Sequence, residues 1–373
     1  MTRRARILLV SPRYPPAVGG VERVVEMLAT GLAQRPFDVV VATTDPSRKL
    51  PPSEAQGSLA IRRFSTIGHD DVFFLSPRLA IWLLRNAGGF DLVHAHSYHT
   101  PLALVGAIAA RLRRVPFVIS THYHGTGHTA GRRLLHGPYR LFGAWMIRQA
   151  SLVICCSEAE RALIREHFGA RLPTMVVKYG LDTKPLPPSG PRPATNGRTV
   201  LAGGRLEGYK QVDLVVRAVE HLPPDMRLIV FGDGPALPEI QAIARKRRVD
   251  ERVDFVGRVS DEELGQHFRT ANVFVSLSRN EAFGLTVAEA VALGTAVVCS
   301  DIPAYREMAD KSPSGALRLL DVDADATDVA EAILAAADAP RPIVPPGSTG
   351  PTWDEMVAET VEGYRGVLEA GPP

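Results

Sequence analysis

The sequence has few cysteines and no long apolar run. Its three cysteines are Cys155, Cys156 and Cys299, and two neighbours plus one distant residue form neither a disulfide framework nor the spacing of a zinc site. We therefore expect three buried thiols in a reducing cytoplasm. The longest apolar stretches, such as 102–110, are far shorter than the roughly 20 residues that span a bilayer, so we expect no transmembrane helix. The run 7–10 is likewise too short for the core of a secretory signal.

Neither sign of charge dominates the sequence. Lys and Arg number 43 and Asp and Glu 40, which gives a formal net charge of +3. This excess is too small to indicate nucleic acid as a partner, although it is compatible with an anionic ligand or membrane surface. With 373 residues, 45% of them hydrophobic and 22% charged, the chain has the composition of a packed protein of two ordinary domains.

Short apolar runs alternate with segments of helical spacing in the first half. The expected strands are 7–10, 39–42, 92–94, 117–120 and 152–155, and the expected helices are 21–32, 76–85, 101–112, 132–149 and 158–167. Such runs are typical of strands buried on both faces of a parallel sheet, so the βαβα order predicts a doubly wound domain.

A proline-rich segment, 183–197, interrupts this pattern and is typical of a linker. A second series follows, with strands at 200–203, 227–231, 253–256, 273–275 and 296–299, and helices at 211–221, 236–247, 261–269 and 285–293. The sequence thus predicts an acceptor-binding domain at 1–182, a donor-binding domain at 198–350, and a C-terminal segment at 351–373 whose helix can pack back on the N-terminal domain. Because open parallel sheets bind ligands at the carboxyl ends of their strands, two facing Rossmann-like sheets predict an interdomain cleft.

The loop at 203–210, GGRLEGYK, places flexible backbone and two cations between an expected strand and helix. Arg205 and Lys210 there are suited to neutralising a diphosphate. A glycine turn with two solvated cations is the alternative. A P-loop is not favoured, since Tyr209 separates Gly208 from Lys210 and Gln211 stands where Ser or Thr holds magnesium.

The segment 280–289 carries two carboxylates, Glu281 and Glu289, on either side of a glycine entry to an apolar helix. If the helix begins near Gly284, the backbone amides of 283–286 and the positive end of the dipole can meet a phosphate, and the carboxylates can bind sugar hydroxyls. The alternative is a dipole-favoured charge followed by a solvated helix glutamate.

Three other glycine turns follow expected strands. Gly232 and Gly234 begin a dinucleotide fingerprint, but Leu237 stands at its third glycine position, so a tight turn explains the pair equally well. Gly257 and Arg258, after the next strand, are placed to present backbone to a nucleotide base, with a simple turn as the alternative. In the first half, the pair 19–20 allows close approach of a ligand or merely makes the loop flexible.

Histidines alternate at two expected strand ends, His94 with His96 and His122 with His124. No carboxylate or cysteine completes a recognisable metal-binding spacing, so we expect no metal site. We expect His122 to contact a polar substrate.

Taken together, the segments 15–23 (PPAVGGVER), 121–122, 204–210 and 281–294 resemble the retaining nucleotide-sugar glycosyltransferases of family 4, which have the two-domain GT-B fold. The resemblance spans nearly the whole chain. It implies that Arg205 and Lys210 hold the donor diphosphate, that Glu289 binds the ribose, and that Glu281 and the backbone of 283–285 bind the donor sugar. It also implies that His122 contacts this sugar from the opposite domain.

One loop departs from the family pattern. Where many members read Pro-Asn-Gly-x-Asp before the linker, residues 178–182 read Lys-Tyr-Gly-Leu-Asp. Side-chain contacts made by that loop in other members are therefore not transferred to this chain.

The resemblance implies retaining transfer of a hexose-type sugar from a nucleoside-diphosphate sugar to a small-molecule, glycan or lipid-linked acceptor, without metal or cofactor. A nucleotide-sugar epimerase and a noncatalytic nucleotide-sugar-binding protein are the alternatives. A nicotinamide oxidoreductase is not favoured, because no complete glycine fingerprint follows the first strand. The predicted catalytic residues are His122, Arg205, Lys210 and Glu281. The predicted donor-binding residues are Gly19, Gly20, Gly204, Arg205, Lys210, Gly257, Arg258, Glu281, Phe283, Gly284, Leu285 and Glu289.

The expected helix at 132–149 is both basic and apolar. Its members of interest are Arg132, Arg133, Leu134, Leu135, Arg140, Leu141, Phe142, Trp145 and Arg148. This composition favours peripheral contact with anionic lipid on the inner face of the membrane, with a core-packed helix and solvated arginines as the alternative.

Overall fold

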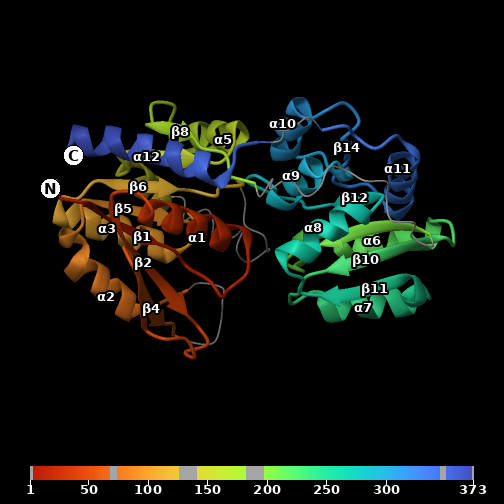
Figure 1. The fold of residues 1–373 in the computed structure, drawn as a ribbon, viewed down its shortest axis with the longest axis horizontal. Helices are drawn as coiled ribbons and strands as arrows, with labels where there is room; N and C mark the ends of the chain where they lie inside the picture. Colours follow the sequence, from red (N-terminus) through yellow and green to blue (C-terminus); the bar gives the residue numbers. More distant parts are fainter. Residues whose placement is uncertain (1–2, 68–73, 126–140, 182–196, 345–349, 372–373) are drawn as a thin grey trace. The chain divides into compact units, whose positions relative to one another are not determined.

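The structure is a computed structural model that describes residues 3–67, 74–125, 141–181, 197–344 and 350–371. It divides into two compact units, the first made of Met1–Gly180 with Pro351–Pro373 and the second of Leu181–Gly350 (Figure 1). The predicted linker lies outside the described residues except for Gly197. Each unit is an α/β domain with a mainly parallel sheet, as the sequence predicts.

The first unit is built on an eight-stranded sheet in the order β3-β4-β2-β1-β5-β6-β7-β8. Its strands are β1 (Ala5–Val10), β2 (Phe37–Asp45), β3 (Ser53–Gln56), β4 (Leu59–Ser65), β5 (Leu92–His96), β6 (Phe117–Ser120), β7 (Leu152–Cys155) and β8 (Thr174–Val176). Only the pairing of β3 with β4 is antiparallel. The strand order reverses between β1 and β5, which are direct neighbours.

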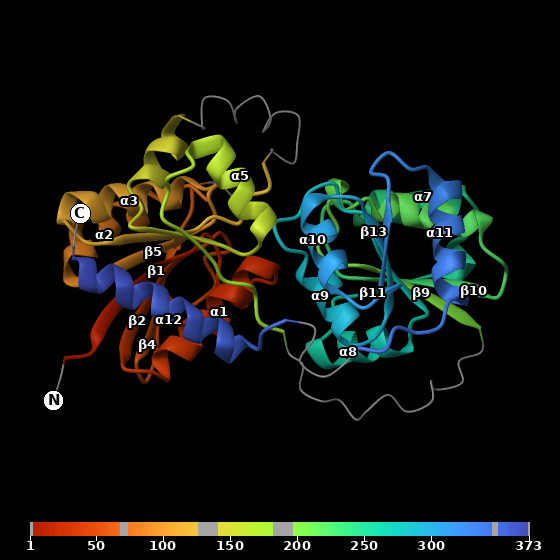
Figure 2. The same cartoon turned by 90° about the horizontal axis from the view of Figure 1, so that it is seen from above.

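Helices cover both faces of this sheet (Figure 2). They are α1 (Gly20–Ala33), α2 (Pro77–Asn86), η1 (Ala87–Gly89), α3 (Pro101–Arg113), α5 (Glu158–Phe168) and α12 (Trp353–Ala370). Leu8 and Val10 of β1 share one apolar core with Leu79 of α2 and Ala103 of α3. The C-terminal helix α12 packs beside α1, where a side chain at Gly31 would lie 2.7 Å from Val357.

The second unit contains a six-stranded sheet, all parallel, in the order β11-β10-β9-β12-β13-β14. Its strands are β9 (Arg198–Gly203), β10 (Met226–Phe231), β11 (Val253–Gly257), β12 (Val273–Ser276), β13 (Ala296–Ser300) and β14 (Leu317–Leu320). This is the 3-2-1-4-5-6 order of a Rossmann sheet, whose direction of winding reverses between β9 and β12.

Two apolar cores separate the helices of this unit by face. The helices are η2 (Gly208–Lys210), α6 (Val212–Ala218), η3 (Val219–His221), α7 (Leu237–Lys246), η4 (Asp250–Arg252), α8 (Asp261–Thr270), α9 (Leu285–Ala292), α10 (Pro303–Lys311) and α11 (Ala326–Asp338). Val200 and Ala202 pack with α6, α7 and α11, whereas Leu201, the residue between them, packs with α8, α9 and α10. The alternation of side chains along β9 thus sets which helices share a face.

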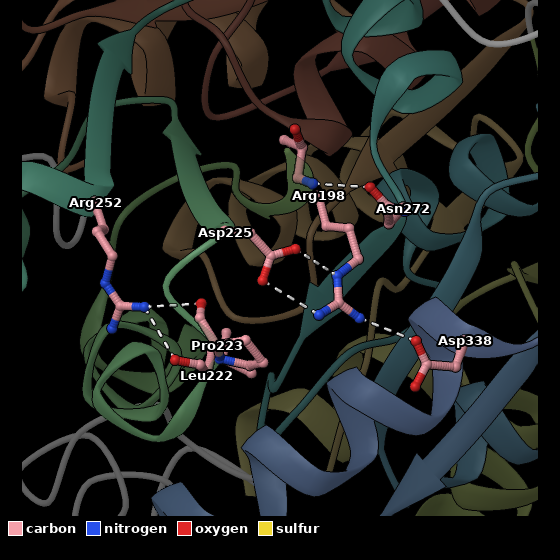
Figure 3. Close-up of polar contacts among 8 residues, drawn as sticks. Arg198, Leu222, Pro223, Asp225, Arg252, Asn272 and Asp338 are labelled. Carbon is pink, nitrogen blue, oxygen red and sulfur yellow. Dashed lines mark hydrogen bonds and ion pairs between the residues drawn. The ribbon is translucent and has the colours of Figure 1, made fainter. Parts of the chain in front are cut away.

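Ion pairs and hydrogen bonds join the amino ends of these strands to neighbouring elements, away from the carboxyl ends considered below (Figure 3). The Arg198 guanidinium donates to Asp225 and to Asp338, with nitrogen–oxygen distances of 3.0 Å to each. Arg252 donates to the carbonyl oxygens of Leu222 and Pro223. These contacts fix β9, the turn before β10 and the end of α11 to one another.

Several other predictions concern surface and burial. All three cysteines are free and buried.

Among the described residues, no helix is long and apolar enough to cross a membrane. Most of the predicted helix at 132–149 lies outside the described residues, but 141–148 are helical, and Leu141 and Phe142 there are 76% and 60% exposed.

Candidate functional site

The loops that leave the carboxyl ends of β9 and β12 meet at the reversal point of the second sheet, which is where open α/β sheets bind ligands. Lys210 lies in η2, after β9, and Glu281 lies between β12 and α9. Lys210 Nζ donates to Glu281 Oε1, and the two side chains are only 18% and 17% exposed. The backbone amide of Arg279 also donates to the Tyr209 carbonyl oxygen, at 2.9 Å, so the two loops are joined twice.

Lys210 is held as a cation in this setting. Burial lowers its pKa, but the negative charge of Glu281, which also accepts its hydrogen bond, outweighs that effect, and the pKa is raised above its ordinary value. The ammonium lies 5.4 Å from the centre of the Tyr209 ring, within cation–π range. Burial raises the pKa of Tyr209 to about 12, against the opposing effect of the Lys210 charge. At neutral pH the site therefore presents a protonated lysine and neutral phenols.

Helix α9 begins beside this ion pair at Gly284, where the backbone conformation and the packing both require a glycine. Gly284 is the N-cap residue, with φ 87° and no side-chain cap, so the first amides of the helix lack the usual capping oxygen. A side chain at 284 would collide with the ring of Tyr305, whose hydroxyl lies 2.9 Å from Ser276 Oγ. Uncapped amides at the positive end of a helix dipole are suited to binding an anion.

The loops after β9, β10 and β11 are interlocked through their backbones. The Gly232 amide donates to the Gly257 carbonyl oxygen at 2.6 Å, and the Leu206 amide donates to the Asp233 carbonyl oxygen at 3.0 Å. Gly232 has φ 99°, and a side chain there would collide with the Gly204 carbonyl oxygen. The incomplete dinucleotide fingerprint at 232–234 is thus explained by close packing of strand-end loops.

The remaining predicted residues of this unit lie at the same carboxyl edge but have their own partners. Arg205 is exposed and its Nε lies 2.7 Å from Glu207 Oε1. Arg258 is also exposed and pairs with Asp233 at 3.4 Å. Phe283 precedes Gly284, Leu285 is the first residue of α9, and Glu289 is partly buried one turn further along. The structure therefore brings Lys210 and Glu281 into direct contact and leaves Arg205 and Arg258 at the surface.

In the first unit, Gly19 is the N-cap residue of α1 with extended backbone, and Gly20 is the first residue of the helix. A side chain at Gly20 would meet no atom within 4 Å. Packing within the described part of the unit therefore gives no reason for a glycine at position 20. Its role in the close approach of a ligand stays a prediction.

His122 occupies a strained turn directly after β6, with φ 47°. Its Nδ1 is hydrogen-bonded to the Tyr179 hydroxyl, and its Nε2 lies 3.3 Å from His96 Nδ1. The buried Glu160 carboxylate accepts from the residues on either side, Thr121 Oγ1 and the Tyr123 amide. Burial lowers the pKa of His122 to about 4. The imidazole of His122 is therefore neutral, and both of its ring nitrogens are engaged, Nδ1 by Tyr179 and Nε2 by His96.

Of the other predicted histidines, His94 and His96 are buried and His124 is partly buried. His94 is fully buried, with Tyr364 Oη 2.6 Å from its Nδ1 and Ser120 Oγ 2.9 Å from its Nε2. Within the residues that the structure describes, no group of three or more His, Cys, Asp or Glu side chains has the arrangement of a metal site.

Four residues to which the sequence patterns assign no role contribute to these sites. Tyr305, Arg279, Tyr179 and Glu160 each act through a partner distant in the chain. Only Tyr179 had a local cue, as the unusual residue in the loop that departs from the family pattern.

Comparison with known families and proteins identifies the family of the chain. Residues 18–184 match the family described as Glycosyltransferase Family 4, and residues 189–340 match Glycosyl transferases group 1. The chain is 30% identical to a glycogen synthase from Mycobacterium tuberculosis over 341 residues, covering 83% of this chain and 81% of that protein. It is 27% identical to the GDP-mannose:cellobiosyl-diphosphopolyprenol alpha-mannosyltransferase of Komagataeibacter xylinus, covering 99% and 95% of the two chains.

Solved structures show the same fold over the full length. Sucrose-phosphate synthase from Thermosynechococcus elongatus has a TM-score of 0.80 at 20% identity, covering 99% of this chain and 100% of that one. Anabaena Alr3699/HepE in complex with UDP and glucose has a TM-score of 0.70 at 20% identity, covering 98% of both. The chain therefore belongs to the glycosyltransferases of the GT-B fold that join a family 4 half to a group 1 half.

Proposed function

We propose that this glycosyltransferase moves a hexose-type sugar from a nucleoside-diphosphate sugar to an acceptor hydroxyl, with retention at the anomeric carbon and without a metal ion. The observation that carries the proposal is the Lys210–Glu281 ion pair beside the uncapped start of α9, at the reversal point of the second sheet. A cation and the start of a helix without a side-chain cap suit a diphosphate, and a carboxylate suits sugar hydroxyls.

The chemical step balances without a cofactor. The bond between the anomeric carbon and the diphosphate oxygen breaks, and the acceptor oxygen forms a new bond to that carbon on the same face. The acceptor proton passes to a phosphate oxygen of the leaving diphosphate. Lys210 and the α9 amides would stabilise the charge that develops on this leaving group, an effect for which one positioned donor is worth about 10²–10³ in turnover.

The predicted roles of the other residues form part of the proposal. Arg205 would join Lys210 at the diphosphate, Glu289 would bind the ribose, and the Gly257–Arg258 turn would meet the base. Glu281 and the backbone of 283–285 would bind the donor sugar, for which His122 and the pair 19–20 are further predicted contacts.

The names of similar proteins support a sugar nucleotide but not one base. The HepE structure contains UDP and glucose, whereas the Komagataeibacter enzyme is named for GDP-mannose. The acceptors named for relatives include a lipid-linked diphosphate and an inositol phosphate. We therefore propose the class of donor and leave the acceptor among small molecules, glycans and lipid-linked glycans.

A donor screen tests this proposal. UDP-, GDP-, ADP- and TDP-sugars are tested by thermal shift, where the true donor stabilises the native state according to its occupancy. The donor that binds is then incubated with candidate acceptors in EDTA, and the anomeric configuration of the product is read by NMR. We expect turnover in EDTA and a product with the configuration of the donor.

Three other outcomes contradict parts of the proposal. Inversion contradicts retention, and loss of activity in EDTA contradicts metal independence. Donor consumption without any acceptor indicates an epimerase, and binding without product by mass spectrometry indicates a noncatalytic binding protein.

We also propose peripheral contact with anionic lipid through helical residues 141–148. Leu141, Phe142 and Trp145 are exposed there, and Arg148 lines a surface pocket together with Arg111. Exposed apolar side chains next to cations are typical of interfacial helices.

A further inference from the structure

The turn that carries His122 is connected to a buried chain of hydrogen bonds in the first unit. Its Nδ1 meets the Tyr179 hydroxyl, and Tyr179 is also hydrogen-bonded to the Cys156 thiol. Cys156 is in turn hydrogen-bonded to the Glu160 carboxylate. The chain of contacts thus returns to the residue that holds the two neighbours of His122.

The direction of each hydrogen bond can be derived from the Glu160 end. The Glu160 carboxylate already accepts from two backbone amides, those of Tyr123 and Cys156, so it acts as an acceptor. The Cys156 thiol must then donate to it, and the Cys156 sulfur accepts from the Tyr179 hydroxyl. Because that hydroxyl has a single proton, its oxygen accepts from His122, which must carry its proton on Nδ1.

The other end of the chain gives the same direction independently. His96 is 1% exposed, and among the described residues its Nε2 has no hydrogen-bond partner. A buried N–H without an acceptor is rarer and more costly than a bare lone pair. The His96 proton therefore lies on Nδ1, where it donates to His122 Nε2 across 3.3 Å.

We infer that Tyr179 is a positioning residue, which fixes His122 as the Nδ1–H tautomer with a hydrogen-bond acceptor at Nε2. The inference rests on the proposed function for its catalytic consequence. In this tautomer Nε2 has no proton to give and accepts from His96, so a substrate hydroxyl can bind at Nε2 only by donating its proton there in place of the His96 N–H. Tyr179 stands where many family members have asparagine. The hydrogen bond that fixes the His122 tautomer is therefore made by a residue at which this chain departs from the family pattern.

The rival account is that Tyr179 only fills space. Removing its hydroxyl separates the two. In Tyr179→Phe, each neutral tautomer of His122 leaves one buried N–H without an acceptor: the Nδ1–H of His122 itself, or the Nε2–H of His96. The two tautomers then become similar in free energy, whereas a space-filling role predicts no change in tautomer.

The test is long-range ¹⁵N–¹H NMR of the full-length protein labelled in histidine, with His122 assigned by its loss in His122→Asn. We expect a single Nδ1–H tautomer in the wild type and a mixture in Tyr179→Phe. Cys156→Ser, which keeps a donor to Glu160 and an acceptor for Tyr179, should retain the single tautomer. Tyr364→Phe is the matched control, because it removes a similar tyrosine–histidine hydrogen bond from His94 and does not touch His122.

Kinetics with the donor found by the screen complete the test. We expect Tyr179→Phe to lower kcat about tenfold or more, as for a misplaced reacting group, with the donor KM and the Tyr364→Phe control within about twofold of wild type. A single unchanged tautomer in Tyr179→Phe overturns the inference, and so does a changed tautomer with undiminished kcat. A wild type that transfers no sugar contradicts the proposed function instead, while the NMR result still decides the tautomer.

Discussion

Lys210 and Glu281 form an ion pair across 71 residues of sequence, because β9 and β12 are neighbours in the sheet and their carboxyl ends place both loops together. If a diphosphate binds at Lys210 as proposed, it competes with Glu281 for the ammonium. On that proposal, the ion pair links the binding of the leaving group to the release of the carboxylate.

Replacing Glu281 by Gln should separate binding from turnover. The free nucleoside diphosphate should bind about fivefold more tightly, since removing about 1 kcal/mol of competition corresponds to that factor. Turnover should fall by about 10² or more, because a carboxylate assigned to the donor sugar is lost. Isothermal titration calorimetry and initial rates measure the two effects.

Two further variants bracket this result. Lys210→Met should weaken binding of the same diphosphate, whereas Arg227→Met should leave it unchanged, because the Arg227–Asp254 pair is 47% and 50% exposed at the surface. Equal or weaker diphosphate binding in Glu281→Gln would show that the carboxylate does not compete for Lys210.

Gly232 is required by the interlocked loops, so Gly232→Ala should destabilise the second unit. A methyl group there meets the Gly204 carbonyl oxygen in a backbone conformation, φ 99°, that non-glycine residues rarely adopt. We expect a loss of about 2–4 kcal/mol in the free energy of unfolding, which denaturant titration by circular dichroism measures. Gly208→Ala, where a methyl group meets nothing within 4 Å, should change stability by less than about 1 kcal/mol. Equal losses in the two variants would contradict the packing explanation.

The buried central strands could be predicted from sequence because each is a short apolar run, as at Ile7–Val10. Most of the sheet edges could not, although the edge strand β11 is predicted at 253–256. Strand β4 lies next to the edge strand β3 and carries Arg62 and Arg63 within LAIRRFS. Arg62 is exposed, whereas the buried Arg63 donates to Glu54 of β3 and to the Pro15 carbonyl oxygen, contacts that the local sequence does not indicate. Strands β3, β8 and β14 and helices α10 and α11 were also not predicted, and β3, β8 and β14 lie at or next to sheet edges.

The candidate site divides in the same way. Lys210, Gly284 and Glu281 could be predicted because each stands in a loop between a recognisable strand and helix. Tyr305 and Tyr179 could not, because their roles depend on contacts with Gly284 and His122 that only the folded chain creates. Local patterns identify which loops leave the carboxyl ends of the strands, whereas the side chains that hold those loops in place are set by tertiary structure.

Stability of the first unit should fall as the pH drops below about 6.5. Burial lowers the pKa of His94 to about 3 and that of His122 to about 4, and His96 is lowered as well. Between these values and 6.5 the unfolded chain takes up protons that the native state does not, so unfolding becomes more favourable as pH falls, by up to about 1.4 kcal/mol per pH unit for each group. Glu160, whose pKa burial raises, acts with the opposite sign nearer its ordinary range.

Tryptophan fluorescence isolates this effect, because the three tryptophans, Trp82, Trp145 and Trp353, all lie in the first unit. Urea unfolding at pH 7, 6 and 5 gives the slope of stability against pH. His94→Gln should show a shallower slope than wild type. An identical slope would indicate that His94 titrates alike in the folded and unfolded states.

The exposed helix at 141–148 should carry binding to anionic vesicles. Leu141 and Phe142 are 76% and 60% exposed, and transferring each into the interfacial region contributes about 1 kcal/mol, less than the full value for burial in a core. Cosedimentation with vesicles of anionic phospholipid should therefore fall about tenfold or more in the double variant Leu141→Ser/Phe142→Ser.

The control is Leu75→Ser/Ile81→Ser, since both of those residues are 48% exposed in the same unit. Wild-type binding should also weaken at high salt, because cations attract the anionic surface. Equal pelleting of the two double variants would show that the exposed apolar face of 141–148 is not the membrane contact.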